Sequence, residues 1–337
     1  MSSKRRIRPL ALAIIVIPAI FAALVVSVLY GAKNIDASTV LEAIFHFEAD
    51  QIDHQIILQS RVPRAVGALL IGAFLAMSGA MMQGMTRNYL ASPSIMGVSD
   101  GSVMAVTLCM ILLPGTSNMG TIVFSLIGSA IGASIVFGLA WLLPNGTSPV
   151  RMAILGTIIG TFLGGIAEAA AMYFQVSQSI SFWYNTRLDQ MDLNMIKLAL
   201  PFAGVGIALA LSLSRSITVL SMGDDVASGL GQRTALVKGL SMLSVVILTG
   251  ISVALAGKIA FVGLLVPHIV RFLVGTDYRA ILPSSALIGG LFLVLCDVAS
   301  RFVNAPYETP IGVVTSLIGV PFFLYLIKRK GGRANAL

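Results

Sequence analysis

Few side chains in this sequence stand where they could do chemistry. Three arginines, Arg61, Arg64 and Arg301, lie at the ends of apolar stretches. A guanidinium group pairs with a carboxylate in bidentate geometry, so these arginines could receive acids of another protein. The alternative is that they only anchor helix ends by extending to the membrane interface. Their positions leave both interpretations open.

A second candidate group lies inside one apolar stretch. Gly156, Gly160 and Gly164 recur every four residues and would share one face of a helix, and Glu168 continues the row. Small residues either let membrane helices pack closely or face a gap kept open for passage. An ionisable residue at membrane depth is a functional candidate, although a paired structural role fits Glu168 equally well. We take these four residues as candidates for a transport path.

A third candidate is the segment 221–234, SMGDDVASGLGQRT. Its two acids suit the first turn of a short helix, and a following glycine would end that helix. Apolar residues at four-residue spacing would form one stripe. Such a helix either lies on the membrane surface or inserts into a groove on a soluble partner, and its acidic start argues against anionic lipid. The residues that would make this contact are Met222, Gly223, Asp224, Asp225, Val226, Ala227, Leu230 and Gly231.

The sequence contains no recognisable motif for catalysis. It has no phosphate-binding loop G-x-x-x-x-G-K-[ST], no H-E-x-x-H pair and no Ser-His-Asp order. His268 has no acid close in sequence, and the stretch HFEADQIDH matches no metal-ligand spacing. We therefore expect neither an enzyme, nor a resident metal, nor a cofactor on this chain.

The elements that position these residues must be membrane helices. Of the 337 residues, 57% are hydrophobic and only 11% are charged, whereas soluble domains have roughly 25% charged residues. The net charge of +8 does not indicate nucleic-acid binding, because the basic residues lie at the ends of apolar segments. Cys109 and Cys296 are far apart and predict no disulfide. The fold class is therefore all-α and polytopic.

A bilayer core about 30 Å thick needs about 20 apolar residues for each helix. By this rule the sequence predicts about ten spans, at 10–30, 64–84, 94–113, 120–143, 151–174, 193–213, 235–256, 258–275, 280–300 and 310–328. The segment 31–60 is then an external segment with room for short helices, and 221–234 is a cytoplasmic loop.

The basic residues orient the predicted spans. With both termini inside, only seven of the 22 basic residues fall outside or near the outer face, as the positive-inside rule expects. These seven are Lys33, Arg61, Arg64, Arg187, Lys197, Lys258 and Arg301. The first apolar run is longer than that of a signal peptide and has no clear cleavage site, so we expect an uncleaved first helix and a cytoplasmic-membrane location.

Several long segments resemble one family of membrane proteins. They run in order from RVPRAVGALLIGAFLAMSGAMMQGMTRN through MGDDVASGLG and AGKIAFVGLLVPHIVRFLVGTDYRAILPSSAL to ETPIGVVTSLIGVPFFLYLI. The chain is similar in these segments to the FecCD permeases of ABC importers for ferric siderophores, haem and vitamin B12. The resemblance implies a single permease domain over 1–337 with ten helices, two such subunits around a central path, and ATP bound by a separate ATPase dimer.

The resemblance also assigns roles to the candidate residues. Asp224 to Gly231 resembles the coupling helix that sits in the ATPase cleft. Arg61, Arg64 and Arg301 resemble arginines that receive acids of an external binding protein. The segment 151–174, with Glu168, corresponds to the helix that lines the path.

Four departures from the family pattern narrow the resemblance. They are Tyr89 after Asn88, the run Asp100-Gly101-Ser102, the segment FWYNTRLDQ and the segment AGKIA. Together they resemble one permease subunit of Gram-positive ferric hydroxamate uptake. This implies a heterodimer with a second, FhuB-like permease subunit and a lipid-anchored siderophore-binding protein outside the cell. Haem, cobalamin or a catecholate siderophore is the alternative cargo. An ion-coupled secondary transporter and a membrane scaffold are the alternatives from other classes.

Overall fold

The computed structural model describes residues 7–31, 35–144, 148–178, 180, 188–304 and 307–334. The basic residues Lys4, Arg5 and Arg6, together with Lys33 and Arg187, lie outside the described residues, as does most of the segment FWYNTRLDQ. The described chain is helical and contains no strand. Its ten long helices correspond one to one with the ten predicted spans. They are α1 (Pro9–Leu29), α4 (Val62–Thr86), α5 (Val98–Leu112), α6 (Asn118–Leu142), α7 (Pro149–Tyr173), α9 (Leu193–Ser212), α12 (Thr234–Ala256), α13 (Val262–Val274), α14 (Tyr278–Phe302) and α15 (Ile311–Ala334).

Seven of these helices are long and apolar enough to cross a membrane, and three are shorter in their apolar part. The short ones are α5, α13 and the 311–325 part of α15. The 15 residues of α5 reach only about 22 Å, less than a bilayer core. The stretch before α5 and the loop before α13 therefore enter the bundle without helical structure.

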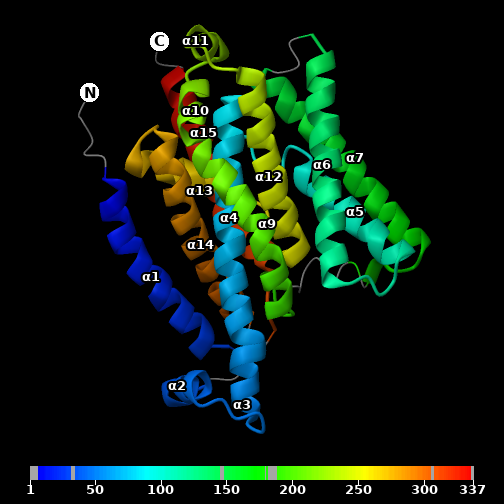
Figure 1. The fold of residues 1–337 in the computed structure, drawn as a ribbon, viewed down its shortest axis with the longest axis vertical. Coiled ribbons are helices and arrows are strands. Elements are labelled where there is room, and N and C mark those ends of the chain that lie inside the picture. Colours follow the sequence, from blue (N-terminus) through cyan, green and yellow to red (C-terminus); the bar gives the residue numbers. More distant parts are fainter. Residues whose placement is uncertain are drawn as a thin grey trace.

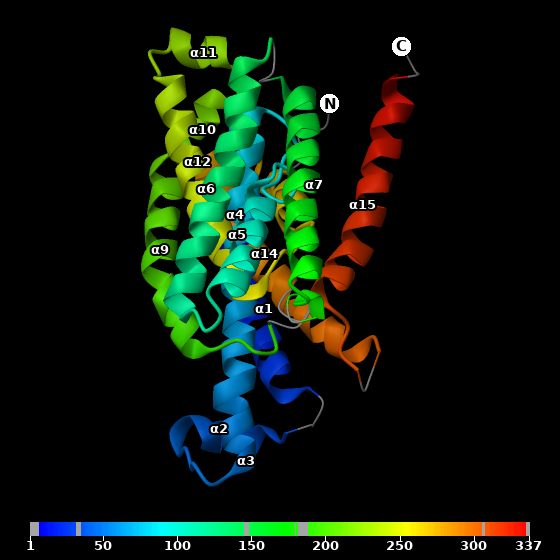
Figure 2. The same cartoon turned by 90° about the vertical axis from the view of Figure 1, so that its right-hand side faces the viewer.

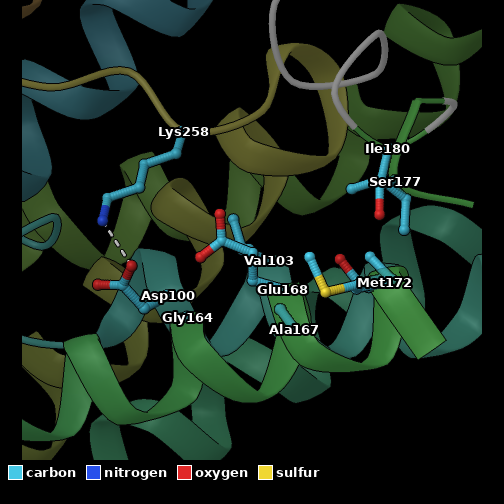
Figure 3. A pocket seen from close by; sticks show the side chains of 11 residues that line it. Asp100, Val103, Gly164, Ala167, Glu168, Met172, Ser177, Ile180 and Lys258 are labelled. Atoms are coloured by element: carbon cyan, nitrogen blue, oxygen red, sulfur yellow. Dashed lines mark hydrogen bonds and ion pairs between the residues drawn. The ribbon is translucent and has the colours of Figure 1, made fainter.

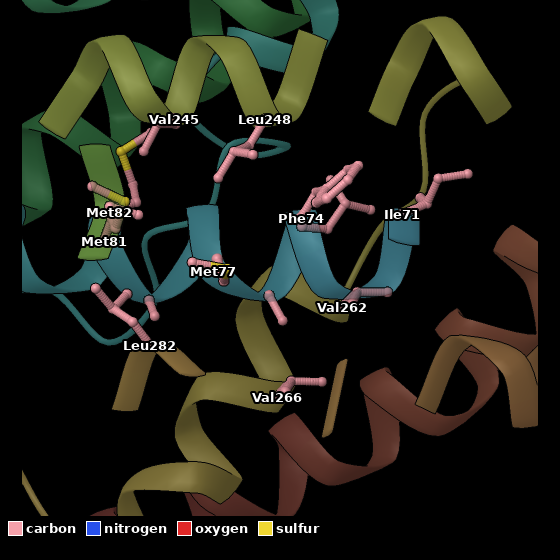
Figure 4. Close-up of a cluster of buried hydrophobic side chains, with 14 of the residues drawn as sticks. Ile71, Phe74, Met77, Met81, Met82, Val245, Leu248, Val262, Val266 and Leu282 are labelled. Carbon is pink, nitrogen blue, oxygen red and sulfur yellow. The ribbon is translucent and has the colours of Figure 1, made fainter. Parts of the chain in front are cut away.

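Helix α4 forms the centre of the molecule. In its apolar window 78% of the residues are buried, against 22% for the peripheral α1. Figure 4 shows Phe74 and Met81 of α4 among apolar side chains of the neighbouring helices, including Leu248 of α12 and Val266 of α13. Helices α12, α13 and α14 all pack directly on α4.

Glycines set the closest approaches in this core. A Cβ on Gly72 would lie 2.2 Å from the carbonyl oxygen of Gly289, and one on Gly79 would lie 1.8 Å from that of Gly263. Side chains at these positions would hold α14 and α13 away from α4. Close packing in membrane helices depends on such small residues, because lipid gives no hydrophobic drive for association.

Short helices occupy both ends of the bundle. At one end lie α10 (Ser214–Leu220) and α11 (Asp224–Gly229), and the start of α1 and the end of α15 lie at the same end of the bundle (Figure 1). At the opposite end lie α2 (Ala37–Phe45), α3 (Ile52–Gln55) and the π-helix η1 (Ile56–Arg61), which continues into α4. The predicted external segment 31–60 thus lies opposite the predicted cytoplasmic loop. Figure 2 shows α15 leaning away from the bundle toward its C-terminal end.

Candidate functional site

The three candidate arginines lie together at the end opposite α11, and all are buried. Arg61 ends η1, Arg64 lies in the first turn of α4, and Arg301 lies in the last turn of α14. Their exposed fractions are 6%, 7% and 7%. None of them is an exposed interfacial anchor, because the guanidinium groups point into the protein rather than toward lipid or water.

Two of these arginines hold the end of α1. Arg61 donates from Nη1 to the carbonyl oxygens of Val28 and Leu29, at 2.6 and 2.8 Å. Arg301 donates from Nη1 to the carbonyl oxygens of Ser27 and Tyr30, at 2.7 and 2.9 Å. The last carbonyls of a helix have no partner within the helix. The two cations therefore cap the C-terminal end of α1 and complement its dipole.

The third arginine is the centre of a carboxylate cluster. Arg64 lies 2.8 Å from Asp297, 2.6 Å from Asp189 and 2.8 Å from Glu308. The Asp297 side chain is 1% exposed and also pairs with Arg301. Asp189 and Glu308 are 37% and 33% exposed. We call Arg64, Asp189, Asp297, Arg301 and Glu308 the outer cluster.

Two acids of the outer cluster differ in their pKa values, and both lie in loops. Burial raises the pKa of Asp189 to about 7, against the attraction of Arg64, and a hydrogen bond to Glu308 adds to this rise. The pKa of Glu308 is lowered overall, because Arg64 and the hydrogen bond from Asp189 outweigh its burial. Asp189 is therefore the member of the cluster that changes charge near neutral pH.

The burial changes what the docking prediction requires. Arg61, Arg64 and Arg301 were expected to present free guanidinium groups to acids of an external protein, and in this structure internal oxygens already occupy them. An incoming carboxylate would have to displace Asp189 or Glu308, which are the half-exposed members of the cluster. Sequence inspection missed this because both acids lie far from Arg64 along the chain.

Helix α11, within the candidate segment 221–234, lies at the opposite end of the molecule. Met222, Val226 and Leu230 are 66%, 46% and 69% exposed, whereas Ala227 between them is fully buried. Gly223 before the helix and Gly231 after it have φ values of 137° and 78°. Only glycine adopts such values readily, so the two glycines turn the chain into and out of the helix. Of the three residues of the predicted apolar stripe, only Val226 lies on the helix itself, and Met222 and Leu230 flank it as exposed residues.

The acids at the start of α11 have different surroundings. Asp224 lies 2.9 Å from Nζ of Lys238 on α12 and 3.9 Å from Nη2 of Arg87. Asp225 is exposed. Exposed ion pairs stabilise a fold by at most about 1 kcal/mol. The tether from Asp224 to α12 therefore orients α11 without fixing it rigidly.

The candidate path residues on α7 fall into two sets: some pack against neighbouring segments and the others line a cavity. A Cβ on Gly156 would lie 2.7 Å from the carbonyl oxygen of Ile95, and one on Gly160 would lie 2.7 Å from Oδ2 of Asp100. These two glycines make room for neighbours and do not line an open gap, which corrects part of the prediction. Gly164 has no neighbour within 4 Å of such a Cβ. It lines a cavity of about 360 Å³ together with Glu168.

The same cavity contains two ionisable residues that sequence inspection did not select. Asp100 and Lys258 line it and form an ion pair, with Oδ1 and Nζ 2.5 Å apart. Lys258 was expected near the outer face, and its ammonium instead reaches a carboxylate beside Gly160. Both residues occur at departures from the family pattern, and these departures were the only feature of the sequence that could have identified them.

In the described residues, no group of three or more His, Cys, Asp or Glu side chains could hold a metal ion. In the stretch HFEADQIDH, the backbone nitrogen of Glu48 donates to Nδ1 of His54 at 3.1 Å. That imidazole thus takes part in the local packing of the loop.

Comparison with known proteins identifies the family to which the chain belongs. Residues 19–329 match the FecCD transport family, a family of transport proteins and not of enzymes. FeuB of Bacillus subtilis (strain 168), an iron-uptake system permease protein, is 59% identical over 94% of this chain and 95% of its own length. FhuB of the same organism, an iron(3+)-hydroxamate import system permease protein, is 51% identical over 90% of this chain and 79% of its own.

FhuG of the same organism is the hydroxamate-import permease subunit that the four departures resemble. It is less similar to this chain than FeuB and FhuB are. It is 31% identical over 85% of this chain and 87% of its own. Among solved structures, an inward-facing conformation of a metal-chelate type ABC transporter superimposes with a TM-score of 0.79 at 26% identity, over 95% of this chain and 99% of that one. Family match, relatives and fold agree, and the chain belongs to the FecCD transport family.

Proposed function

We propose that this chain is a permease subunit of an ABC importer that carries a ferric hydroxamate siderophore, of the ferrichrome type, across the cytoplasmic membrane. One observation carries the proposal. Helix α11 and the residues that flank it expose Met222, Val226 and Leu230 at one end of a bundle of apolar helices, in a chain without a phosphate-binding loop. An apolar stripe on a short helix fits a groove on a soluble partner, and the missing ATP site is what such a partner would supply.

This assignment orients the protein. The α11 end faces the cytoplasm together with both termini, and the residues from Met222 to Gly231 contact the cleft of an ATPase dimer. The opposite end, with the segment 31–60 and the outer cluster, faces a lipid-anchored binding protein. The cavity beside Gly164 and Glu168 forms part of the path, and a second permease subunit, FhuB-like, completes it. Residues 1–337 act as one transmembrane domain.

The names of the relatives support iron as the transported element. FhuB is named for iron(3+)-hydroxamate import, and FeuB is named for iron uptake. Ferric iron is the cargo and not a resident cofactor, so the path needs no iron ligands of its own. The cargo therefore interacts with this chain through the outer surface of its chelator.

The structure gives little support to an ion-coupled secondary transporter. Such transporters hold their coupling ions at buried acids beside broken helices. The buried acids of the described chain are Asp100 and Asp297, and each already has a cationic partner, Lys258 and Arg301 respectively. Neither carboxylate is open to a coupling ion.

The test is uptake of radiolabelled iron by cells that depend on this permease, its ATPase and its binding protein. Uptake of ferric trihydroxamate should stop when the ATPase carries a substitution in its phosphate-binding loop, and it should continue when an ionophore collapses the ion gradients. The reverse pattern would reject the ABC assignment. Supplying the iron as a tris-catecholate or as haem, and cobalamin in parallel, tests the cargo, since faster uptake of one of these would replace the hydroxamate.

A further inference from the structure

The ion pair between Asp100 and Lys258 brings opposite charges together inside the bundle. Asp100 lies in the first turn of α5, and Lys258 lies in the loop 257–261 between α12 and α13. Their side chains are 9% and 36% exposed. Asp100 is thus held within the protein, while Lys258 remains accessible from the cavity that both residues line (Figure 3).

The pair lies at membrane depth. Oδ2 of Asp100 lies beside Gly160, near the midpoint of the helix α7, which runs from Pro149 to Tyr173. The short helix α5 begins close to this point, since a Cβ on Gly160 would lie 3.7 Å from Cα of Gly97, and the loop that carries Lys258 leads into the short helix α13. Ionisable residues at such depth are energetically costly, and where they occur in membrane proteins they commonly mark a transport path. Binding sites of membrane transporters form where discontinuous helices meet.

Glu168 contributes a third charge to the same space. Figure 3 shows its carboxylate directed from α7 into the cavity, in the direction of Lys258. Lys258 is the single cation among the described lining residues, and Asp100 and Glu168 are the two acids. The formal charges of the lining therefore sum to one negative unit.

The loop that carries Lys258 is held in a defined conformation. Gly257 and Phe261, at its two ends, have φ values of 70° and 69°. The Phe261 ring lies against Gly319 of α15, where a Cβ would be only 2.4 Å from Cγ. A left-handed backbone at a bulky residue is strained, and such strain persists where the surroundings impose it. The backbone of Lys258 therefore has a set position in the cavity wall, and the ion pair with Asp100 places its ammonium.

We infer that Asp100, Lys258 and Glu168 form a charge-discriminating contact for the ferric chelate as it passes this subunit. The inference rests on the proposed function and adds specificity-determining residues to it. Lys258 donates to negatively charged oxygens of the chelator, and Asp100 compensates most of that attraction. Glu168 makes the balance negative, so the cavity favours neutral or cationic chelates over anionic ones.

The size of the effect follows from Coulomb attraction. One unit of charge in the wall, acting over about 8 Å at an effective dielectric constant of about 40, changes the transport rate roughly fivefold for each unit of charge on the cargo. Substituting an acid or Lys258 by its neutral isostere changes the lining charge by one unit. The effect has opposite signs for cationic and anionic cargo, and a loss of structure would not produce that pattern.

The experiment uses one linear ferric trihydroxamate with its terminal amine free, acetylated or succinylated, which makes the chelate cationic, neutral or anionic. Uptake is measured in proteoliposomes that contain the complete transporter with its binding protein. Each variant's rate is divided by the wild-type rate for the same chelate, so the selectivity of the binding protein cancels. Lys197→Gln removes an exposed cation outside the cavity and serves as the matched control.

Lys258→Gln should raise the ratio of cationic to anionic uptake by about 25-fold, because these chelates differ by two units of charge and each unit contributes about fivefold. Asp100→Asn and Glu168→Gln should each lower it by a similar factor, and the double variant Asp100→Asn with Lys258→Gln should restore the wild-type ratio. Glu168 is exposed, so its variant tests the sign of the effect even if loss of the buried Asp100 carboxylate prevents folding. Equal losses for all three chelates would overturn the inference. If the wild-type transporter takes up none of them, the hydroxamate proposal itself fails.

Discussion

Arg64 donates from Nε to Oδ1 of Asp297 at 2.8 Å, although 233 positions separate the two residues in the chain. Asp297 binds Arg301 through its other oxygen, so one buried carboxylate bridges two guanidinium groups. The first turn of α4 and the last turn of α14 are thereby joined at the outer end. Close packing of Gly72 against Gly289 joins the same two helices deeper in the bundle.

Removing the shared carboxylate should destabilise the permease. Asp297→Asn leaves Arg301 buried with only neutral partners, and breaking a buried pair by removing one member costs about 3–5 kcal/mol. We expect a lower melting temperature in detergent and less folded protein in the membrane. Asp50→Asn, on the exposed loop before α3, is the control and should melt like the wild type. An unchanged melting curve for Asp297→Asn would show that the cluster contributes little to stability.

The outer cluster should make stability depend on pH. The pKa of Asp189 is raised from 3.8 to about 7, chiefly by burial. A carboxyl group with a raised pKa stabilises the fold while it is protonated, and this contribution is lost as the pH rises from the unfolded pKa through about 7. The lowered pKa of Glu308 changes the stability of the fold only in more acidic solution, below the ordinary pKa of 4.5.

The melting temperature in detergent should therefore fall between about pH 5 and about pH 7 and then level off. Asp189→Asn should remove most of this slope, because the amide does not titrate. Asp36→Asn, at an exposed position before α2, is the control and should keep the slope. A slope that survives in Asp189→Asn would assign the pH dependence to another group.

Close packing of α4 on α13 gives a steric prediction. A methyl group at Gly79 would lie 1.8 Å from the carbonyl oxygen of Gly263, and backbone at that distance cannot move aside without separating the two helices. Gly79→Ala should therefore cost about 2 kcal/mol or more. Gly138→Ala, on α6 with open space around it, should be neutral or stabilising by up to about 1 kcal/mol. Thermal unfolding of both variants in one detergent gives the comparison, and equal melting temperatures would contradict the tight contact.

Features that depend on neighbours in sequence could be predicted well. The apolar runs predicted the ten helices, because a membrane helix needs a continuous apolar stretch whatever it packs against. Helix α11 was also predictable, since its acids, glycines and apolar stripe all lie within 221–234. The starts of α5 and α13 were placed about four residues too early, because Gly97 and Phe261, both with positive φ, are the N-cap residues and delay the helix beyond the start of the apolar run.

Features that depend on distant residues could not be predicted. Asp100 and Lys258 are 158 positions apart, and no local pattern shows that they meet. The arginines gave the same difficulty, because their positions left docking and interfacial anchoring both open, while the internal partners lie on α1, on α14 and in two loops. The glycine row on α7 was interpreted as one unit, and only its contacts separate the packing of Gly160 on Asp100 from the open position of Gly164.

The coupling role of α11 gives the last prediction. Val226 and Leu230 are exposed on one stripe, so replacing both with Asp adds two charges to the surface proposed to enter the ATPase cleft, without disturbing the buried Ala227. Burying an unpaired charge in an interface costs several kcal/mol, which should abolish ATPase co-purification and siderophore uptake while leaving the permease in the membrane.

The matched control for this double variant is Leu41→Asp with Ile44→Asp on α2. These residues form an exposed apolar face at the opposite end of the molecule, with exposed fractions of 57% and 54%. Because α2 lies far from α11, the same number of added charges should leave ATPase co-purification intact. Normal ATPase binding and uptake in the Val226 and Leu230 variant would refute the coupling role, whereas loss of ATPase binding in both variants would indicate a general effect of charge.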